Sequence, residues 1–207
     1  MARSLLVSLL RSCALPLAFA LPAGAQNNND DQVFQFESGP LVLDGEMMRA
    51  KAPRITQGNL RIAADDVLAT GVEFDESGEF RFSGNVRIDV DTAFMEANAA
   101  VFTYAKGRLS HGELQGTPVS FTDVDPVNQR TVTGQAGNMS YDYDTRTLRM
   151  MGNASVQLAT REVSGCDLIY DFRAERVTSG SAECADGFRV TLRRDPAERA
   201  AAPDPPQ

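Results

Sequence analysis

The sequence lacks the patterns that most enzymes need for their chemistry. His111 is the single histidine, and no Ser or Cys of the nucleophile-elbow kind stands near it. It lies between Gly107 and Gly112, a segment that we expect to form a solvated turn. The segment from Gly134 to Gly137 is not a phosphate loop, because neither a strand-to-helix transition nor a lysine follows it. These absences argue against hydrolytic and nucleotide-dependent enzymes and predict a protein that works without a cofactor.

Grouped metal ligands are also lacking. The acidic pairs Asp89 with Asp91 and Asp142 with Asp144 each lie two residues apart, so on a strand both carboxylates of a pair face the same, solvated side. Calcium loops need several oxygens and a glycine-bearing turn in a defined order, and neither pair stands in one. We therefore predict no metal site.

No hydrophobic run is long enough to span a bilayer. The apolar stretch from Cys13 to Leu21 is too short to cross, but it follows Arg3 and precedes Ala23-Gly24-Ala25, as in a signal peptide. Arg11, close before Cys13, argues against lipidation. We expect residues 1–25 to be removed before Gln26 and the protein to enter the periplasm.

Basic residues are scarce relative to acids, with 20 Lys and Arg against 28 Asp and Glu and a net charge of -8. Loss of residues 1–25 removes Arg3 and Arg11 and no acid, which gives -10. This balance argues against nucleic acid as a partner. It does not exclude an anionic lipid whose acyl chains lie in an apolar cavity while its head group stays in water.

Two cysteines remain after cleavage, Cys166 and Cys184. In an oxidising compartment they predict a disulfide that closes the last hairpin around a turn near Arg173 to Arg176. Such a loop would contribute about 3 kcal/mol. Two buried free thiols are the alternative.

At the C-terminal end, residues 195–207 are rich in Ala and Pro without apolar periodicity, which predicts a disordered tail and leaves residues 26–194 as one domain.

Between Gln32 and Arg194 the apolar residues mostly alternate with polar ones, and Gly, Asn, Asp and Pro interrupt them at short intervals. This pattern is typical of strands with one buried face. It is clearest in five segments: 80–82, 86–90, 148–150, 156–158 and 168–170. No long segment has a convincing helical period, and the nearest one, Leu60 to Ala69, fits a period of two equally well.

The strand pattern repeats. An apolar residue, any residue, a small residue and then a polar one or Cys recur, with the small residue at positions 64, 97, 134 and 165, at spacings of 33, 37 and 31. Repeats of this size bury their faces by stacking on neighbours. A second element contains Gly84-Asn85, Gly116-Thr117 or Gly152-Asn153 and predicts a bulge or sharp bend. The residues alone thus predict a β-sandwich, jelly roll or short β-solenoid.

Five segments resemble, in order, the periplasmic LptA/OstA-like lipopolysaccharide-transport family. They are Phe82-Ser-Gly-Asn-Val-Arg-Ile, Leu114-Gln-Gly-Thr-Pro-Val-Ser-Phe, Val132-Thr-Gly-Gln-Ala-Gly-Asn-Met-Ser-Tyr-Asp, Leu148-Arg-Met-Met-Gly-Asn-Ala and Val163-Ser-Gly-Cys-Asp-Leu-Ile-Tyr-Asp. The resemblance covers residues 80–192 well. The segment Ile55 to Asp65 resembles one that normally follows the first Gly-Asn-Val of the family, but here it precedes Gly84-Asn85-Val86. We therefore expect about one extra repeat near residues 38–79.

The resemblance implies a twisted, open β-jelly roll with an apolar interior that binds lipid A, the lipid part of lipopolysaccharide. Family positions that contact lipid correspond to Phe34, Phe36, Phe121, Tyr141 and Tyr143. Alternation adds a second set of residues to the same apolar face: Phe82, Val86, Ile88, Phe102, Met139, Met150, Val156, Leu158, Leu168 and Tyr170. For each of these residues, plain core packing is the alternative role.

The resemblance also implies partners. These are an LptC-like inner-membrane component, an LptD-like outer-membrane component, and like protomers joined edge to edge in a bridge. An LptC-like role is disfavoured because no retained anchor is visible. Two other classes stay open: a structural β-sandwich that binds protein or glycan without lipid, and a β-solenoid that cleaves polysaccharide. The cleaving enzyme would need grouped carboxylates and basic residues in a cleft, which the sequence does not indicate.

Overall fold

The computed structural model describes residues 34–71, 77–180, 184 and 187–192. The expected signal peptide and the expected C-terminal tail lie outside the described residues. Within the described part every regular element is a β-strand, as the alternation predicted, and none of it is a helix long and apolar enough to cross a membrane.

The strands are short at both ends of the chain and long in the middle. In chain order they are β1 (Phe34–Glu37), β2 (Leu41–Asp44), β3 (Met47–Lys51), β4 (Arg54–Gln57), β5 (Leu60–Ala63), β6 (Asp66–Thr70), β7 (Ser77–Val90), β8 (Ala93–Ala105), β9 (Arg108–Val124), β10 (Thr131–Asp142), β11 (Thr147–Leu158), β12 (Arg161–Asp171), β13 (Arg176–Ser179) and β14 (Arg189–Leu192).

All of them belong to one antiparallel sheet in which each bent strand pairs with the one before it and the one after it. β7 shows how the short strands fit: its residues 87–90 pair with β5, and its residues 79–83 pair with β6. β5 and β6 are therefore the two halves of one bent strand. The pairs β1 with β2 and β3 with β4 are bent strands of the same kind, because β4 pairs with β1 and β5 while β3 pairs with β2 and β6.

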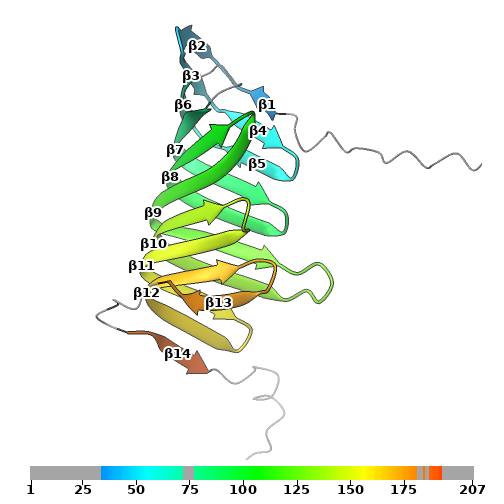
Figure 1. Cartoon of the computed structure of the whole chain (residues 1–207), viewed down its shortest axis with the longest axis vertical. Coiled ribbons are helices and arrows are strands. Elements are labelled where there is room, and N and C mark those ends of the chain that lie inside the picture. The colour runs from blue at the N-terminus through cyan, green and yellow to red at the C-terminus, as the bar shows by residue number, and fades with distance from the viewer. Residues whose placement is uncertain (1–33, 72–76, 181–183, 185–186, 193–207) are drawn as a thin grey trace, which may run out of the picture.

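The bends, which we call corners, fold the sheet onto itself and create two layers. Layer A contains β1, β4, β5, β14 and residues 86–90, 93–96, 119–124, 131–136, 154–158 and 161–165 of the long strands. Layer B contains β2, β3, β6, β13 and residues 77–83, 99–105, 108–115, 138–142, 147–151 and 167–171. Figure 1 shows the bent strands stacked along the long axis, with β2 near one end and β14 at the other.

The predicted bends coincide with corners. Gly84 and Asn85 have φ of 75° and 45°, Gly152 and Asn153 have φ of 76° and 52°, and the pairing register shifts at both places. Positive φ is cheap for Gly and tolerable for Asn, so the ladder can turn there. The register also shifts near Gly116. The Gly-Asn motif thus marks the corner of a bent strand.

The small residue at position 134 does not lie at a corner, since the bend of β10 falls at Ala136 and Gly137. Gly134 instead lies within the strand opposite Phe121, whose ring occupies the space that a Cβ atom at position 134 would need. A glycine is required there by close packing, and the sequence pattern alone does not separate that reason from a bend.

One expectation from the sequence needs correction. The segment from Gly107 to Gly112 is a turn only at its start, because β9 begins at Arg108. His111 is therefore a strand residue, with its Nε2 atom 3.2 Å from the Ser140 hydroxyl and 3.7 Å from a Glu113 carboxylate oxygen. The additional repeat near residues 38–79 stays a prediction, although residues 38–71 and 77–79 continue the same two layers.

Gly134 gives a direct test of the packing. We expect Gly134→Ala to lower the free energy of unfolding by about 1–3 kcal/mol, since the new methyl group displaces a buried Phe121 ring. Gly137→Ala is the matched control on the same strand, because a Cβ atom there would lie 3.5 Å from the nearest atom, in ordinary contact. Chemical denaturation followed by circular dichroism measures both. Equal stabilities of the two variants would contradict this account.

Candidate functional site

The space between the two layers is filled by rows of side chains that run across the whole stack. One row of layer A is Phe36, Ile55, Ile62, Ile88, Met95, Phe121, Gly134, Val156, Val163 and Val190. One row of layer B is Leu43, Met48, Ala69, Phe80, Phe102, Gly112, Tyr141, Leu148, Tyr170 and Val177. The apolar interior is therefore continuous from the first strand to the last.

The structure places all fifteen residues of the predicted lipid-binding set in this interior. Eleven are buried: Phe82, Val86, Ile88, Phe102, Phe121, Met139, Tyr141, Met150, Val156, Leu168 and Tyr170. Phe34, Phe36, Tyr143 and Leu158 are partly buried and pack against them. Sequence reasoning missed equal members such as Ile55, Phe80 and Leu114. The same alternation could have identified them.

Aromatic rings connect the layers. Phe34 of layer A stacks on Phe80 of layer B with ring centroids 5.4 Å apart, and Phe121 of layer A stacks on Tyr170 of layer B at the same centroid distance. Phe172 adds edge-on contacts to Tyr170 at 4.8 Å. These rings fill the interior, so in this state the two layers touch and leave no open channel between these rings.

A polar link also crosses the interior. Asp123 of layer A is only 6% exposed and accepts hydrogen bonds from the hydroxyls of Thr92 and Tyr170, the latter at 2.9 Å. Burial, followed by this hydrogen bond to Asp123, raises the pKa of the Tyr170 hydroxyl, which therefore stays a donor. The carboxylate is satisfied by partners in both layers and holds them together.

On the side of the stack opposite the corners, which we call the mouth, contacts made by side chains join the two layers in the part of the chain that the structure describes. The Gln57 side chain of layer A donates to the Gly107 carbonyl at 2.7 Å and accepts the Leu109 amide at 3.0 Å. Asp91 pairs with Arg146 across the mouth at 2.9 Å, and Arg130 pairs with Glu175 at 2.6 Å. Exposed ion pairs each contribute at most about 1 kcal/mol, so this closure is weak compared with the covalent corners.

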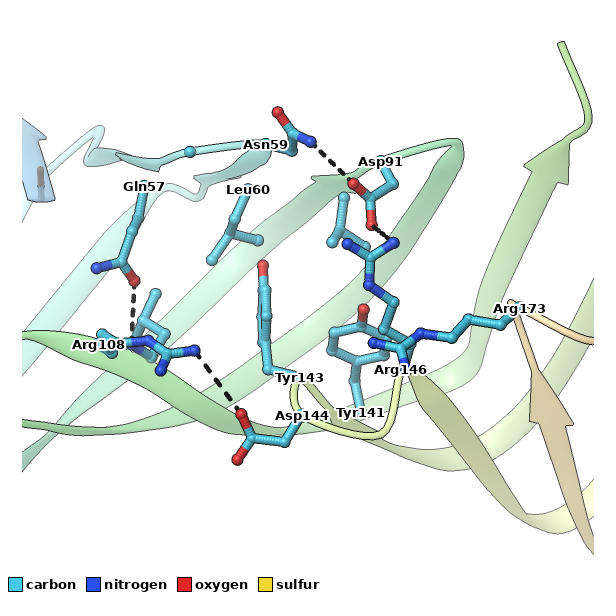
Figure 2. A pocket seen from close by; sticks show the side chains of 13 residues that line it. Gln57, Asn59, Leu60, Asp91, Arg108, Tyr141, Tyr143, Asp144, Arg146 and Arg173 are labelled. Atoms are coloured by element: carbon cyan, nitrogen blue, oxygen red, sulfur yellow. Dashed lines mark hydrogen bonds and ion pairs between the residues drawn. The ribbon is translucent and has the colours of Figure 1, made fainter. Parts of the chain in front are cut away.

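A cavity of about 310 Å³ lies at the mouth, between turns of both layers. Its lining includes Tyr141, Tyr143, Arg108, Arg146 and Arg173, which Figure 2 shows around one space. Burial raises the pKa of Tyr141 to about 12 and raises that of Tyr143 as well. The Tyr143 hydroxyl is buried and has no hydrogen-bond partner among the described residues.

Known proteins agree with this architecture. A sequence model of the family described as LptA/(LptD N-terminal domain) LPS transport protein matches residues 66–176. The chain belongs to this family. Its membership in a family of transport proteins confirms the expected relationship and the expectation that the protein is not an enzyme.

The fold of this LptA/LptD N-terminal family member also matches a solved structure. LptH of Pseudomonas aeruginosa, described as the LptA-homologous periplasmic component of the conserved lipopolysaccharide transport device, superposes with a TM-score of 0.50 at 10% identity. The match covers 80% of this chain and 99% of LptH, and it confirms the open, all-β jelly-roll fold. No curated protein sequence matches the chain.

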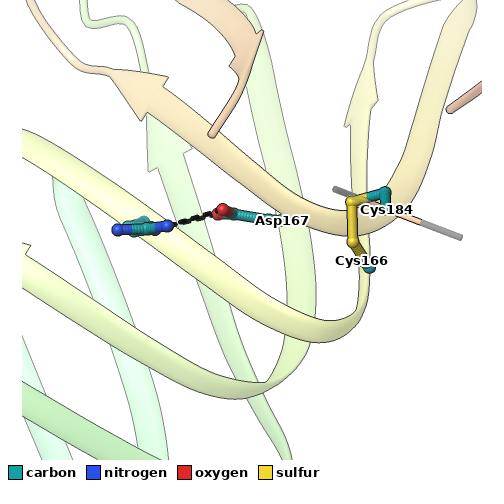
Figure 3. Close-up of a disulfide and its surroundings, with 4 residues drawn as sticks. Cys166, Asp167 and Cys184 are labelled. Carbon is teal, nitrogen blue, oxygen red and sulfur yellow. Dashed lines mark hydrogen bonds and ion pairs between the residues drawn. A yellow bond between two sulfur atoms is a disulfide. The ribbon is translucent and has the colours of Figure 1, made fainter. Parts of the chain in front are cut away.

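The C-terminal corner of this family member is held differently from the others. Cys166, on β12, forms a disulfide with Cys184, which precedes β14, and their Cα atoms are 5.7 Å apart (Figure 3). The neighbouring Asp167 is 5% exposed and accepts two hydrogen bonds from the Arg149 guanidinium, at 2.9 and 2.6 Å. These hydrogen bonds to Asp167 raise the pKa of Arg149. The disulfide thus fastens Cys184 to β12, and the Arg149–Asp167 pair joins β11 to β12.

The unpartnered Tyr143 hydroxyl predicts an unusual substitution effect. We expect Tyr143→Phe to raise the free energy of unfolding by about 1 kcal/mol, because the variant no longer buries an unsatisfied polar group. Tyr170→Phe is the matched control and should lower it by roughly 1–3 kcal/mol, since Asp123 loses a donor. Denaturation curves of both variants measure the difference. A loss of stability in Tyr143→Phe equal to that in the control would contradict the assignment.

Proposed function

We propose that this protein carries lipopolysaccharide through the periplasm, with the acyl chains of lipid A held between the two layers. The observation that carries the proposal is the apolar interior, which continues to both ends of the stack and is open there. Leu41 and Leu43 at one end are 46% and 64% exposed, and Val190 and Leu192 at the other are 61% and 75% exposed. Leu41, Leu43 and Val190 are aligned with the inward-facing Ala50, Met48 and Val163, so these three belong to the interior rows.

Lipid must then take space that side chains now fill. Burying an acyl chain yields about 0.8 kcal/mol per methylene, so ten methylenes give about 8 kcal/mol. The polar contacts at the mouth oppose separation of the layers by a few kcal/mol in total. Acyl chains can therefore offset the opening of the mouth, while the corners keep the two layers joined. The fifteen predicted interior residues are the proposed lipid contacts.

The two ends are suited to joining further domains of the same kind. β1 runs toward its corner and β2 away from it, whereas β13 runs toward its corner and β14 away. A copy that sets its β1 beside β14 and its β2 beside β13 continues the antiparallel order in both layers at once. Open edge strands are templates for such pairing. The proposed partners are like protomers, an LptC-like component at one end and an LptD-like component at the other.

The periplasmic location is part of the same proposal. It rests on the signal-peptide pattern of residues 1–25 and on the likeness to LptH, which is described as periplasmic. The disulfide between Cys166 and Cys184 is consistent with an oxidising compartment.

A second candidate function is a structural interaction protein that carries no lipid. The filled interior favours it, because the largest buried side chains, including Phe80, Phe121 and Tyr170, are less than 2% exposed. The exposed apolar ends fit this alternative less well, since a protein without an interior ligand gains nothing from leaving its core open at both ends.

Photo-cross-linking separates the two functions. A photoreactive residue at Phe121 faces the interior, while one at the next position, Thr122, faces outward from the same strand. We expect lipopolysaccharide adducts at position 121 and few at position 122 when the protein is exported to a Gram-negative periplasm. Folded protein without adducts at position 121 would favour the structural alternative.

The end-to-end contact is tested by blocking each end separately. We expect Leu43→Asp and Leu192→Asp each to abolish the concentration-dependent self-association of the wild type, because a charge would be buried in the joint. Mixing the two variants should restore a dimer through their intact ends, which sedimentation velocity would detect. Val127→Asp is the control, since Val127 is 86% exposed on the loop between β9 and β10, away from both ends. Unchanged association of both end variants would refute the contact.

A further inference from the structure

The mouth cavity gathers positive charge in an acidic protein. Three arginines line it, Arg108, Arg146 and Arg173, although the whole chain carries a net charge of -8. They come from three different turns of layer B, which the fold brings to one place. Two carboxylates, those of Asp91 and Asp144, line the same space.

The two carboxylates neutralise two of these arginines and leave the third without a countercharge. Asp91 pairs with Arg146 at 2.9 Å, and Asp144 lies 3.7 Å from Arg108. The Arg173 guanidinium forms no ion pair with any residue that the structure describes. It extends toward Arg146 in Figure 2, and both cations lower the pKa of Tyr141 against the effect of burial. Asp91 and Asp142 act on the same ring in the opposite sense, so it is the unpaired Arg173 guanidinium that favours the entry of an anion.

Tyr143 provides a hydrogen-bond donor without a partner. Its hydroxyl is buried at the cavity and unpaired among the described residues. Burial raises its pKa, so the hydroxyl keeps its proton and can donate. Tyr143 and Arg173 line the same cavity, so an anionic oxygen group that entered it could accept from both.

We propose that the mouth cavity binds a phosphate monoester, held by the Arg173 and Arg146 guanidinium groups and the Tyr143 hydroxyl. Guanidinium forks match phosphate oxygens in bidentate geometry. The cavity of about 310 Å³ exceeds the volume of a phosphate and leaves room for part of a sugar. The proposal rests on the proposed function, because acyl chains between the layers beside Tyr141 would place a phosphorylated head group at this mouth.

The test compares two lipids and three variants of the mature protein. Equilibrium binding is measured for a fluorescent diphosphorylated lipid A and for the same lipid with its phosphates removed, in one detergent. We expect Arg173→Gln to weaken binding of the phosphorylated lipid about tenfold and to leave the other unchanged. Tyr143→Phe should weaken it in the same sense while making the free protein more stable, a combination that a purely structural tyrosine would not give.

Arg176→Gln is the matched control, because Arg176 carries the same charge, is exposed at the start of β13 and does not line the cavity. Equal affinity of Arg173→Gln and Arg176→Gln for both lipids overturns the phosphate site. Adducts at position 121 in the same variants show in that case that lipid carriage itself survives. If the protein without mouth substitutions gave no lipopolysaccharide adducts at position 121, lipid carriage itself would be refuted.

The source of the phosphate is settled by adding millimolar inorganic phosphate during thermal unfolding. A rise of the midpoint in the wild type but not in Arg173→Gln means that the cavity binds phosphate from any carrier. No rise, together with the discrimination between the two lipids, means that the lipid must deliver it. An equal rise in wild type and Arg173→Gln counts against the site.

Discussion

Every property of this fold depends on one backbone constraint: each long strand must bend sharply without losing its alternation. At Gly84-Asn85 and Gly152-Asn153 the chain takes positive φ, shifts register and then resumes pairing. Residues before and after the bend keep their apolar side chains on the same face of the sheet. A single antiparallel meander, in which neighbours in sequence are neighbours in space, thereby becomes a two-layered body with a common interior.

The two sides of this body differ in strength. At the corners the layers are joined by the chain itself, and near the C-terminal corner a disulfide also ties Cys184 to Cys166. At the mouth they are joined by contacts such as Gln57 with Leu109 and Asp91 with Arg146. When the contacts at the mouth break, water can form hydrogen bonds with the exposed polar groups. Separating the layers at the mouth therefore costs much less free energy than unfolding a strand. The fold therefore has one side on which it can yield.

Much of the middle of the fold could be predicted from the sequence, because alternation and Gly-Asn motifs are local. The strands around Phe82, Met150 and Tyr170 and most of the interior set follow from that pattern. The reason for the glycine at position 134 could not be predicted, because a glycine that makes room for the Phe121 ring looks the same in the sequence as one that allows a bend. The mouth could not be predicted, since Gln57 meets Leu109 across 52 positions and a polar residue in a turn gives no signal of its distant partner. The role of Tyr143 was equally hidden: alternation places its ring inside but says nothing about its hydroxyl.

The difference between the corners, where the backbone joins the layers, and the mouth, where side-chain contacts join them, has a mechanical consequence. Contacts at the mouth are separate from one another along the stack, and each strand touches only its neighbours, so the layers can part at one level while the levels above and below stay shut. A ligand between the layers would then move along the stack, separating the mouth contacts ahead of it while the contacts behind it form again. A ligand carried in this way would need no permanent channel, and the closed parts of the stack would shield it from water along most of its path.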